Sequence, residues 1–164
     1  MGTNGTKRLV LLCLACCLAL SAATLLARRA DKEGDLVARL EHETDPVKRA
    51  KLEIRLAHVK LVQATETFDQ GNIAGSRELL GAFLERVHSA WSTLQKSGRP
   101  AHKKPQGFKE LDIELREDVR YLEDLKHRFP YAEREPVEKV AHEVDDLRNE
   151  VLKALFPPLP PKRK

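Results

Sequence analysis

Apolar residues recur at every third or fourth position between residues 31 and 156, and no other feature of this 164-residue chain constrains the fold more. This spacing places apolar side chains on one face of an α-helix. A β-strand would need apolar residues at alternate positions, and no segment sustains that pattern. Residues that favour helices, such as Leu, Ala, Glu, Lys and Arg, are also abundant here. We therefore predict an all-α fold.

Proline, glycine and capping residues divide this region into five predicted helices. Asp45 is a natural N-cap, and Pro46 suits the first position of the helix that follows it. Asn72 can cap the next long helix, and Pro136 begins the last one. Residues 97–107 contain two glycines and two prolines and are a predicted loop. The predicted spans are 35–43, 46–70, 73–97 and 108–128, with a fifth helix from residue 136 onward.

Each long helix carries a line of apolar residues that is predicted to face the core, which we call its seam. The helix over 46–70 is apolar on a second face as well. A helix that is apolar on two faces is typically packed between neighbours. Its main seam is Val47, Ala50, Ile54, Ala57, Leu61, Ala64 and Phe68, with Leu52, Leu56 and Val59 on the other face. The seam of the next helix is Ile73, Ser76, Leu80, Phe83, Val87, Ala90 and Leu94. The last two seams are Phe108, Leu111, Leu115, Val119, Leu122 and Leu125, and Val137, Val140, Val144, Leu147, Val151 and Ala154.

The lengths of the helices and of their connections predict how they pack. The turn at residues 70–72 is too short for anything but an antiparallel return, and Phe129-Pro130 separates the last two helices. Helices of 20 to 25 residues would be roughly 30–37 Å long. We predict a four-helix antiparallel bundle of two helical hairpins, preceded by a short helix. A superhelical stack of two hairpins is the alternative, and the wide apolar seams leave a homodimer open.

One turn has a local resemblance to a known repeat family. The string from Phe68 to Ile73, with Ser76 at a small-residue position, resembles the inter-helix turn of a tetratricopeptide repeat. The resemblance covers about residues 64–84. It implies a helical hairpin that contributes to a peptide-binding groove. A helical hairpin of no particular family would explain the same residues.

Residues 1–30 form a leader with four basic residues, no acidic residue and all three cysteines. Lys7 and Arg8 precede the apolar core Leu9–Leu20, and Ser21-Ala22-Ala23 offers a cleavage site, as in a secretory signal peptide. The apolar run continues through residues 9–27, which nearly suffices to span a bilayer. The leader is therefore a signal peptide or a retained signal anchor. Both interpretations predict an extracytoplasmic protein, periplasmic or secreted, and the second adds membrane contact.

Outside the leader, the chain divides into a predicted helical domain, residues 31–156, and a proline-rich basic tail, residues 157–164. Residues 31–164 contain no cysteine, which excludes disulfides and thiolate metal sites there. They also contain equal numbers of basic and acidic residues, which disfavours nucleic acid as a partner.

No phosphate-binding loop, nucleophile elbow or paired zinc-protease histidines occur in the sequence. We predict a non-enzymatic protein without a cofactor that acts through contacts with another, unidentified protein in the cell envelope. An extracytoplasmic ligand- or metal-binding sensor and a membrane-tethered adaptor are the alternatives.

Two helical Glu/His pairs, Glu123 with His127 and Glu138 with His142, have the four-residue spacing that puts two ligands on one helix face. If two such pairs face one another in a bundle, they can supply four metal ligands. The same residues also suit an ordinary solvated helix face, and we predict no metal site there.

Two basic segments are candidates for binding a partner. The predicted loop and its start carry Lys96, Arg99, Lys103 and Lys104 without an acidic residue. In the tail, Pro157, Pro160 and Lys162 have the spacing of a polyproline ligand with a terminal cation. A solvated linker and a stiff, extended terminus are the simpler interpretations of these two segments.

Overall fold

The computed structural model describes residues 33–158, and within them every regular element is helical. A helix covers residues 33–42. The long helices that follow are α2 (Pro46–Asp69), α3 (Ile73–Lys96), α4 (Phe108–Arg128) and α5 (Glu135–Leu155), with a short 3-10 helix η1 (Tyr131–Glu133) before α5. The predicted all-α fold is therefore confirmed for the described residues. Residues 39–158 belong to one compact unit, which contains α2 to α5.

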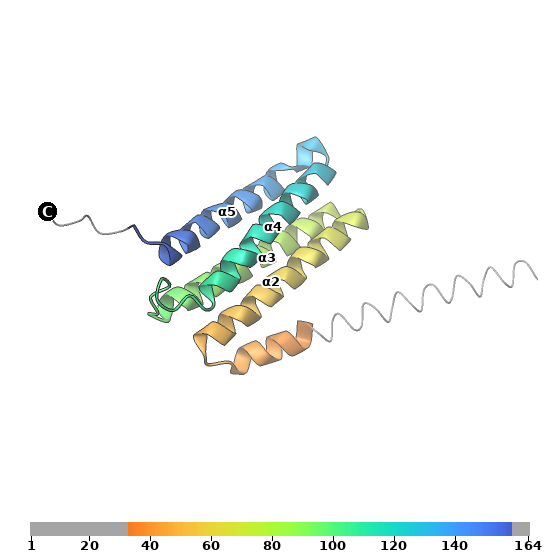
Figure 1. Cartoon of the computed structure of the whole chain (residues 1–164). Helices are drawn as coiled ribbons and strands as arrows, with labels where there is room; N and C mark the ends of the chain where they lie inside the picture. Colours follow the sequence, from red (N-terminus) through yellow and green to blue (C-terminus); the bar gives the residue numbers. More distant parts are fainter. Residues whose placement is uncertain (1–32, 159–164) are drawn as a thin grey trace, which may run out of the picture. The chain divides into compact units, whose positions relative to one another are not determined.

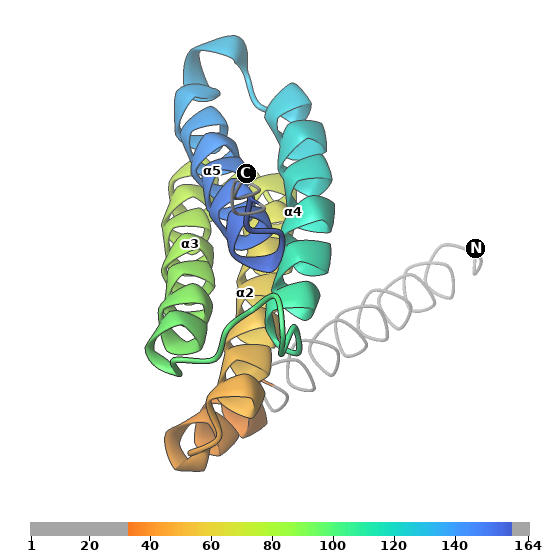
Figure 2. The ribbon, with the colours of Figure 1, turned by 60° about the vertical axis from the view of Figure 1, so that its left-hand side comes forward.

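The four long helices pack side by side as a helical bundle (Figure 1). Helix α2 packs most extensively on α3, and α4 packs most extensively on α5. The two pairs meet where α3 contacts α5 and α2 contacts α4, so the order around the bundle is α2, α3, α5, α4 (Figure 2). The core therefore lies between two helical pairs.

The boundaries of the helices follow from local chemistry. Asp45 Oδ1 accepts a hydrogen bond from the Lys48 backbone N–H at 2.8 Å, and Pro46 occupies the start of α2. Asn72 Oδ1 accepts from the Gly75 N–H at 2.9 Å and begins α3. Gly107 precedes α4 with φ +87°, and a Cβ there would lie 2.6 Å from a Leu94 methyl group. Glycine is therefore required at this turn.

The predicted seams form one continuous core that includes residues of all four helices. The second apolar face of α2 is buried as well, since Leu52 and Leu56 are almost fully covered. One position in α4 differs from the prediction. Val119 is half-buried, whereas its neighbour Asp118 is only 2% exposed. The core-facing residues of α4 are therefore Phe108, Leu111, Leu115, Asp118, Leu122 and Leu125, which are three, four, three, four and three positions apart.

Buried polar contacts link neighbouring helices. Glu53 of α2 is 2% exposed, and its two carboxylate oxygens accept hydrogen bonds from Arg86 at 3.1 Å and Ser89 at 3.0 Å, both on α3. Asp112 of α4 accepts from Arg148 of α5 at 3.1 Å. Because each bond requires one axial alignment of two helices, these contacts fix the relative register of the helices.

Within residues 33–158, no helix combines the length and the apolar composition that a membrane crossing needs. The predicted leader, residues 1–30, lies outside the described residues, as do residues 159–164 of the tail.

Candidate functional site

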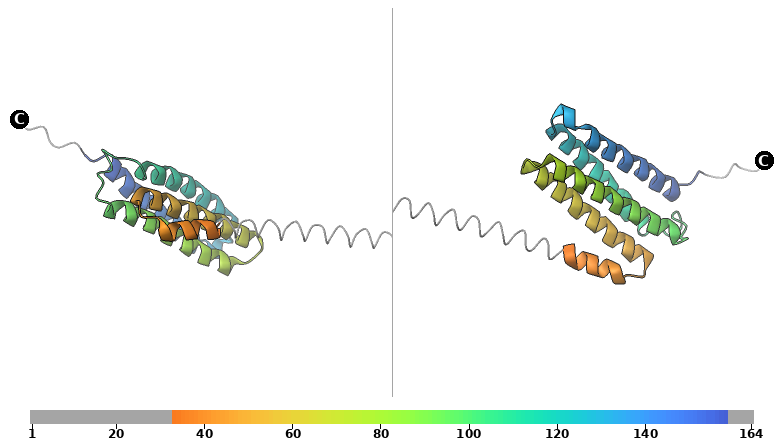
Figure 3. Two further views of the ribbon diagram at one scale, coloured as in Figure 1. Left: turned by 90° about the horizontal axis from the view of Figure 1, so that it is seen from below. Right: turned by 180° about the vertical axis from the view of Figure 1, so that it is seen from behind.

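One end of the bundle collects the features that the sequence offers for binding a partner. Helix α3 ends there at Lys96, α4 begins there at Phe108, and α5 ends there at Leu155. Loop 97–107 crosses this end next to the last turn of α5 in both views (Figures 1 and 3). We call this surface, made of residues 95–107 and 150–157, the basic pole.

Hydrogen bonds and packing order the loop. The Ser97 hydroxyl donates to the Leu94 carbonyl at 2.6 Å, and the Arg99 N–H donates to Ser97 Oγ at 3.3 Å. The N–H groups of Lys103 and Lys104 both donate to the carbonyl oxygen of Pro100, at 3.0 and 2.9 Å. Ala101 is buried. The backbone is therefore held, while the side chains of Lys103 and Lys104 extend into solvent.

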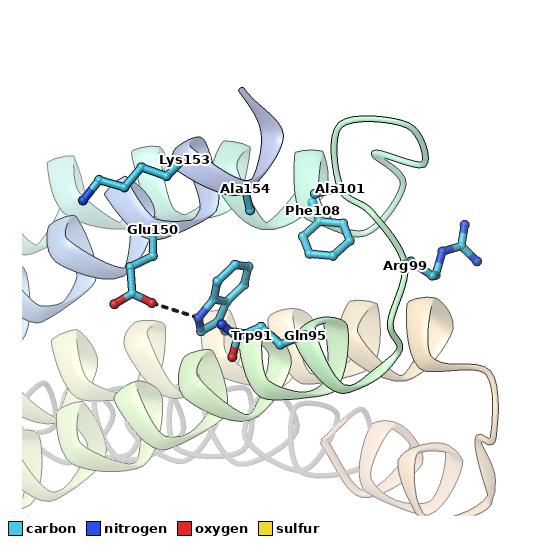
Figure 4. Close-up of a pocket in the computed structure, with 8 residues that line it drawn as sticks. All are labelled: Trp91, Gln95, Arg99, Ala101, Phe108, Glu150, Lys153 and Ala154. Carbon is cyan, nitrogen blue, oxygen red and sulfur yellow. Dashed lines mark hydrogen bonds between the residues drawn. The ribbon is translucent and has the colours of Figure 1, made fainter. Parts of the chain in front are cut away.

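A pocket of about 440 Å³ opens between this loop, α3 and α5 (Figure 4). Its apolar part comprises Trp91 and Phe108, whose rings meet edge to face with centroids 6.0 Å apart, together with Ala101 and Ala154. The remaining lining residues are Gln95, Arg99, Glu150 and Lys153. An apolar floor with a few polar groups at the rim is the usual construction of a site that receives a side chain of a ligand or partner.

The polar rim contains one satisfied pair and one unsatisfied donor. The indole Nε1–H of Trp91 donates to Glu150 Oε2 at 3.0 Å, which fixes the ring and connects α3 to α5. The Nε of Arg99 is buried and has no hydrogen-bond partner in the described part of the chain. A buried guanidinium donor without an acceptor favours the approach of an anion.

The cations at the basic pole outnumber the anions. Lys96, Lys103, Lys104 and Lys153 are exposed, and Arg99 is half-buried. Within residues 33–158, none of the five forms an ion pair. This end of the bundle therefore presents uncompensated positive charge.

The structure brings the two predicted partner-binding segments together in part. Arg99 from the loop lines the same pocket as Lys153 and Ala154 of α5, and α5 continues directly into Phe156 and Pro157. Phe156 is 71% exposed and lines a second pocket, which shares Glu150 and Lys153 with the first. Pro160 and Lys162 lie outside the described residues.

The sequence pattern places Phe108 in the core and does not single out Trp91, Glu150 or Lys153 as site residues. A signal was present, since the chain has a single tryptophan. Tryptophan is rarely fully buried because it is large, and its N–H usually needs an acceptor.

The four residues weighed as metal ligands lie on ordinary solvated surfaces. Glu123 pairs with Lys126 one turn later. His142 Nδ1 lies 2.9 Å from Asp146 Oδ2, and both side chains are largely exposed. His127 and Glu138 are exposed. Among residues 33–158, one set of three ligand-type side chains lies close together, and it contains none of these four.

Comparisons with family models, with curated proteins and with solved structures found no match for this chain.

Proposed function

We propose that this chain is an exported, non-enzymatic helical protein that acts by binding another protein, and that the basic pole is its binding surface. The observation that carries the proposal is the pocket floored by Trp91 and Phe108 beside cations that lack ion-pair partners. Interfaces typically combine a buried aromatic anchor with a polar rim that excludes water.

The chemistry of the pole defines the partner segment. The pocket accepts one apolar side chain, and the surrounding Lys96, Lys103 and Lys104 attract carboxylates on either side of it. We therefore infer a partner segment in which an apolar residue is flanked by Asp or Glu. Complementary charge of this kind raises the association rate and makes binding sensitive to salt.

We infer that the bundle is a four-helix antiparallel bundle of two hairpins that serves as a rigid platform for this surface. The three-residue connection between α2 and α3 and the extensive packing within each pair support this arrangement. The proposal requires no second copy of the chain, although a homodimer remains compatible with it.

The leader supports export through its basic start, apolar core and small-residue cleavage site. A cleaved leader would give a periplasmic or secreted protein, whereas retention of residues 9–27 would give a membrane-tethered adaptor. N-terminal sequencing of the protein isolated from its own cells distinguishes the two forms.

Site-specific photocrosslinking in cells tests the proposed surface. A photoreactive residue replaces Gln95, which is exposed and lines the pocket, in the full chain. We expect one crosslinked product, and we expect Lys103→Glu combined with Lys104→Glu to reduce its yield at least tenfold because the carboxylates are then repelled.

Lys139, exposed in the first half of α5, provides the control position for the photoreactive residue. It should give no product that depends on Lys103 and Lys104. A product at Gln95 that is insensitive to the double charge reversal would contradict an acidic partner. Absence of any product at Gln95 would contradict the basic pole as the binding surface.

A further inference from the structure

Helix α4 carries a carboxylate in its apolar seam. Asp118 lies between Leu115 and Leu122 at the spacing of the core positions, and it is 2% exposed. Its Oδ2 atom is buried and has no hydrogen-bond partner in residues 33–158. A buried carboxylate without a partner destabilises a fold unless it takes up a proton or meets a hydrogen-bond donor or a cation.

Two further ligand-type groups face Asp118. Glu114 lies one turn earlier on α4, and His58 reaches the same place from α2. His58 Nδ1 lies 3.2 Å from Glu114 Oε1. One nitrogen or oxygen atom from each of the three side chains lies within 4.8 Å of the other two.

We propose that His58, Glu114 and Asp118 bind a first-row divalent metal ion, with zinc as the best-matched ion. Metal–ligand bonds of about 2.0–2.2 Å place tetrahedral ligand atoms roughly 3.4 Å apart. The His58–Glu114 separation already matches that value, and His58, whose side chain is about half exposed, has room to adjust toward Asp118. Three protein ligands leave a fourth position for water.

The composition of the ligand set selects the class of ion. Imidazole nitrogen suits zinc and its neighbours in the first transition row, whereas calcium and magnesium take oxygen ligands and need more of them. Two carboxylates and a neutral imidazole together neutralise a divalent cation, which is necessary at a site where one ligand is buried.

The state of Asp118 without metal agrees with this assignment. Burial, together with the nearby carboxylates of Glu114 and Glu117, raises the pKa of Asp118 to about 8. Burial also raises the pKa of Glu114, against the opposing effect of His58. A proton therefore occupies the place on Asp118 that a cation would take.

A metal ion bound here would connect the two helical pairs. His58 belongs to the α2–α3 pair, and Glu114 and Asp118 belong to the α4–α5 pair. The packing between α2 and α4 is much less extensive than the packing within either pair. Binding to the folded state alone would therefore raise the thermal stability of the whole bundle.

Calorimetric titration with ZnCl2 tests the site in the full chain, after treatment with a chelator and with Cys13, Cys16 and Cys17 replaced by serine, because thiolates also bind zinc. We expect one ion per chain with micromolar or tighter affinity, at least tenfold weaker binding in His58→Ala and in Asp118→Asn, and a rise in Tm on adding zinc that both variants lose. CaCl2 should give neither heat nor a Tm shift. Replacement of zinc by Co2+ should give a visible absorption band that Asp118→Asn abolishes.

His142→Ala is the matched control, because His142 also faces a carboxylate at 2.9 Å but has no buried third ligand. It should bind zinc as the parent does. Circular dichroism verifies that each variant is folded, and Asp118→Asn keeps the shape of the side chain if His58→Ala does not fold. Unchanged affinity in Asp118→Asn, or loss of binding in His142→Ala alone, would overturn the assignment. Equal responses to zinc and calcium would do the same.

Discussion

At the scale of single residues, Asp118 makes the free energy of unfolding depend on pH. The pKa of Asp118 is about 8 in the folded chain, and its ordinary value is 3.8. Between these two pH values, the folded state keeps a proton that the unfolded state has already released. In metal-free solution, stability contributed by this group is therefore complete below about pH 4 and is lost as pH rises through about 8. The slope is at most about 1.4 kcal/mol per pH unit.

Asp118→Asn removes this dependence, since the amide is neutral at every pH. We expect the variant to be more stable than the parent at pH 8 and to show a flatter profile between pH 5 and pH 8. Urea unfolding in the presence of a chelator provides the measurement. Asp146→Asn, at a largely exposed position, is the control and should change the free energy of unfolding by less than about 0.5 kcal/mol. A parent profile that is flat over the same range would contradict the raised pKa.

The buried acidic residues also show where sequence reasoning fails. A periodic pattern assigns charged residues to the solvated face by default. Glu53, Asp112 and Asp118 are buried although they are acidic. Glu53 and Asp112 accept hydrogen bonds from arginines on neighbouring helices, whereas Asp118 occupies a core position of α4. In α4, core positions that alternate three and four residues apart would include Asp118. The predicted seam contains Val119 in its place because Val119 is apolar.

At the scale of helices, the boundaries are predictable because proline, glycine and caps act locally. Asp45, Asn72 and Gly107 set the starts of α2, α3 and α4 within one residue of the predicted positions. The order of helices around the bundle depends on contacts between residues far apart in sequence. For that reason the sequence identified Lys96, Arg99, Lys103 and Lys104 as a basic segment but not their proximity to α5.

The contact between α2 and α3 through Glu53 yields a prediction at the same scale. In Arg86→Ala, the buried carboxylate of Glu53 retains only the Ser89 hydroxyl, so we expect a loss of about 1–3 kcal/mol in the free energy of unfolding. Adding Glu53→Gln should restore part of that loss, because a neutral amide costs less to bury. Chemical denaturation of the three variants gives the result.

Lys139→Ala, an exposed truncation on α5, is the comparison for Arg86→Ala and should be nearly neutral. If Arg86→Ala were equally neutral, the Glu53 carboxylate would not depend on its ion pair. If Glu53→Gln worsened the effect, the carboxylate would be stabilising even without the arginine.

At the scale of the whole molecule, one core joins both helical pairs, so residues 39–164 should unfold as a single cooperative unit. Leu115→Ala, a truncation at a fully buried position of α4, should lower stability by about 2–5 kcal/mol. Trp91, the single tryptophan, reports on the contact of α3 with Phe108 of α4 and Glu150 of α5, and circular dichroism reports on all helices. We expect Leu115→Ala to shift both signals to the same lower urea concentration. Ile113→Ala on the same helix, at a side chain that is 52% exposed, should shift them little. A Trp91 transition that separates from the loss of helicity would show that the bundle does not unfold as one unit, and a bridging metal ion would then be needed to couple the two pairs.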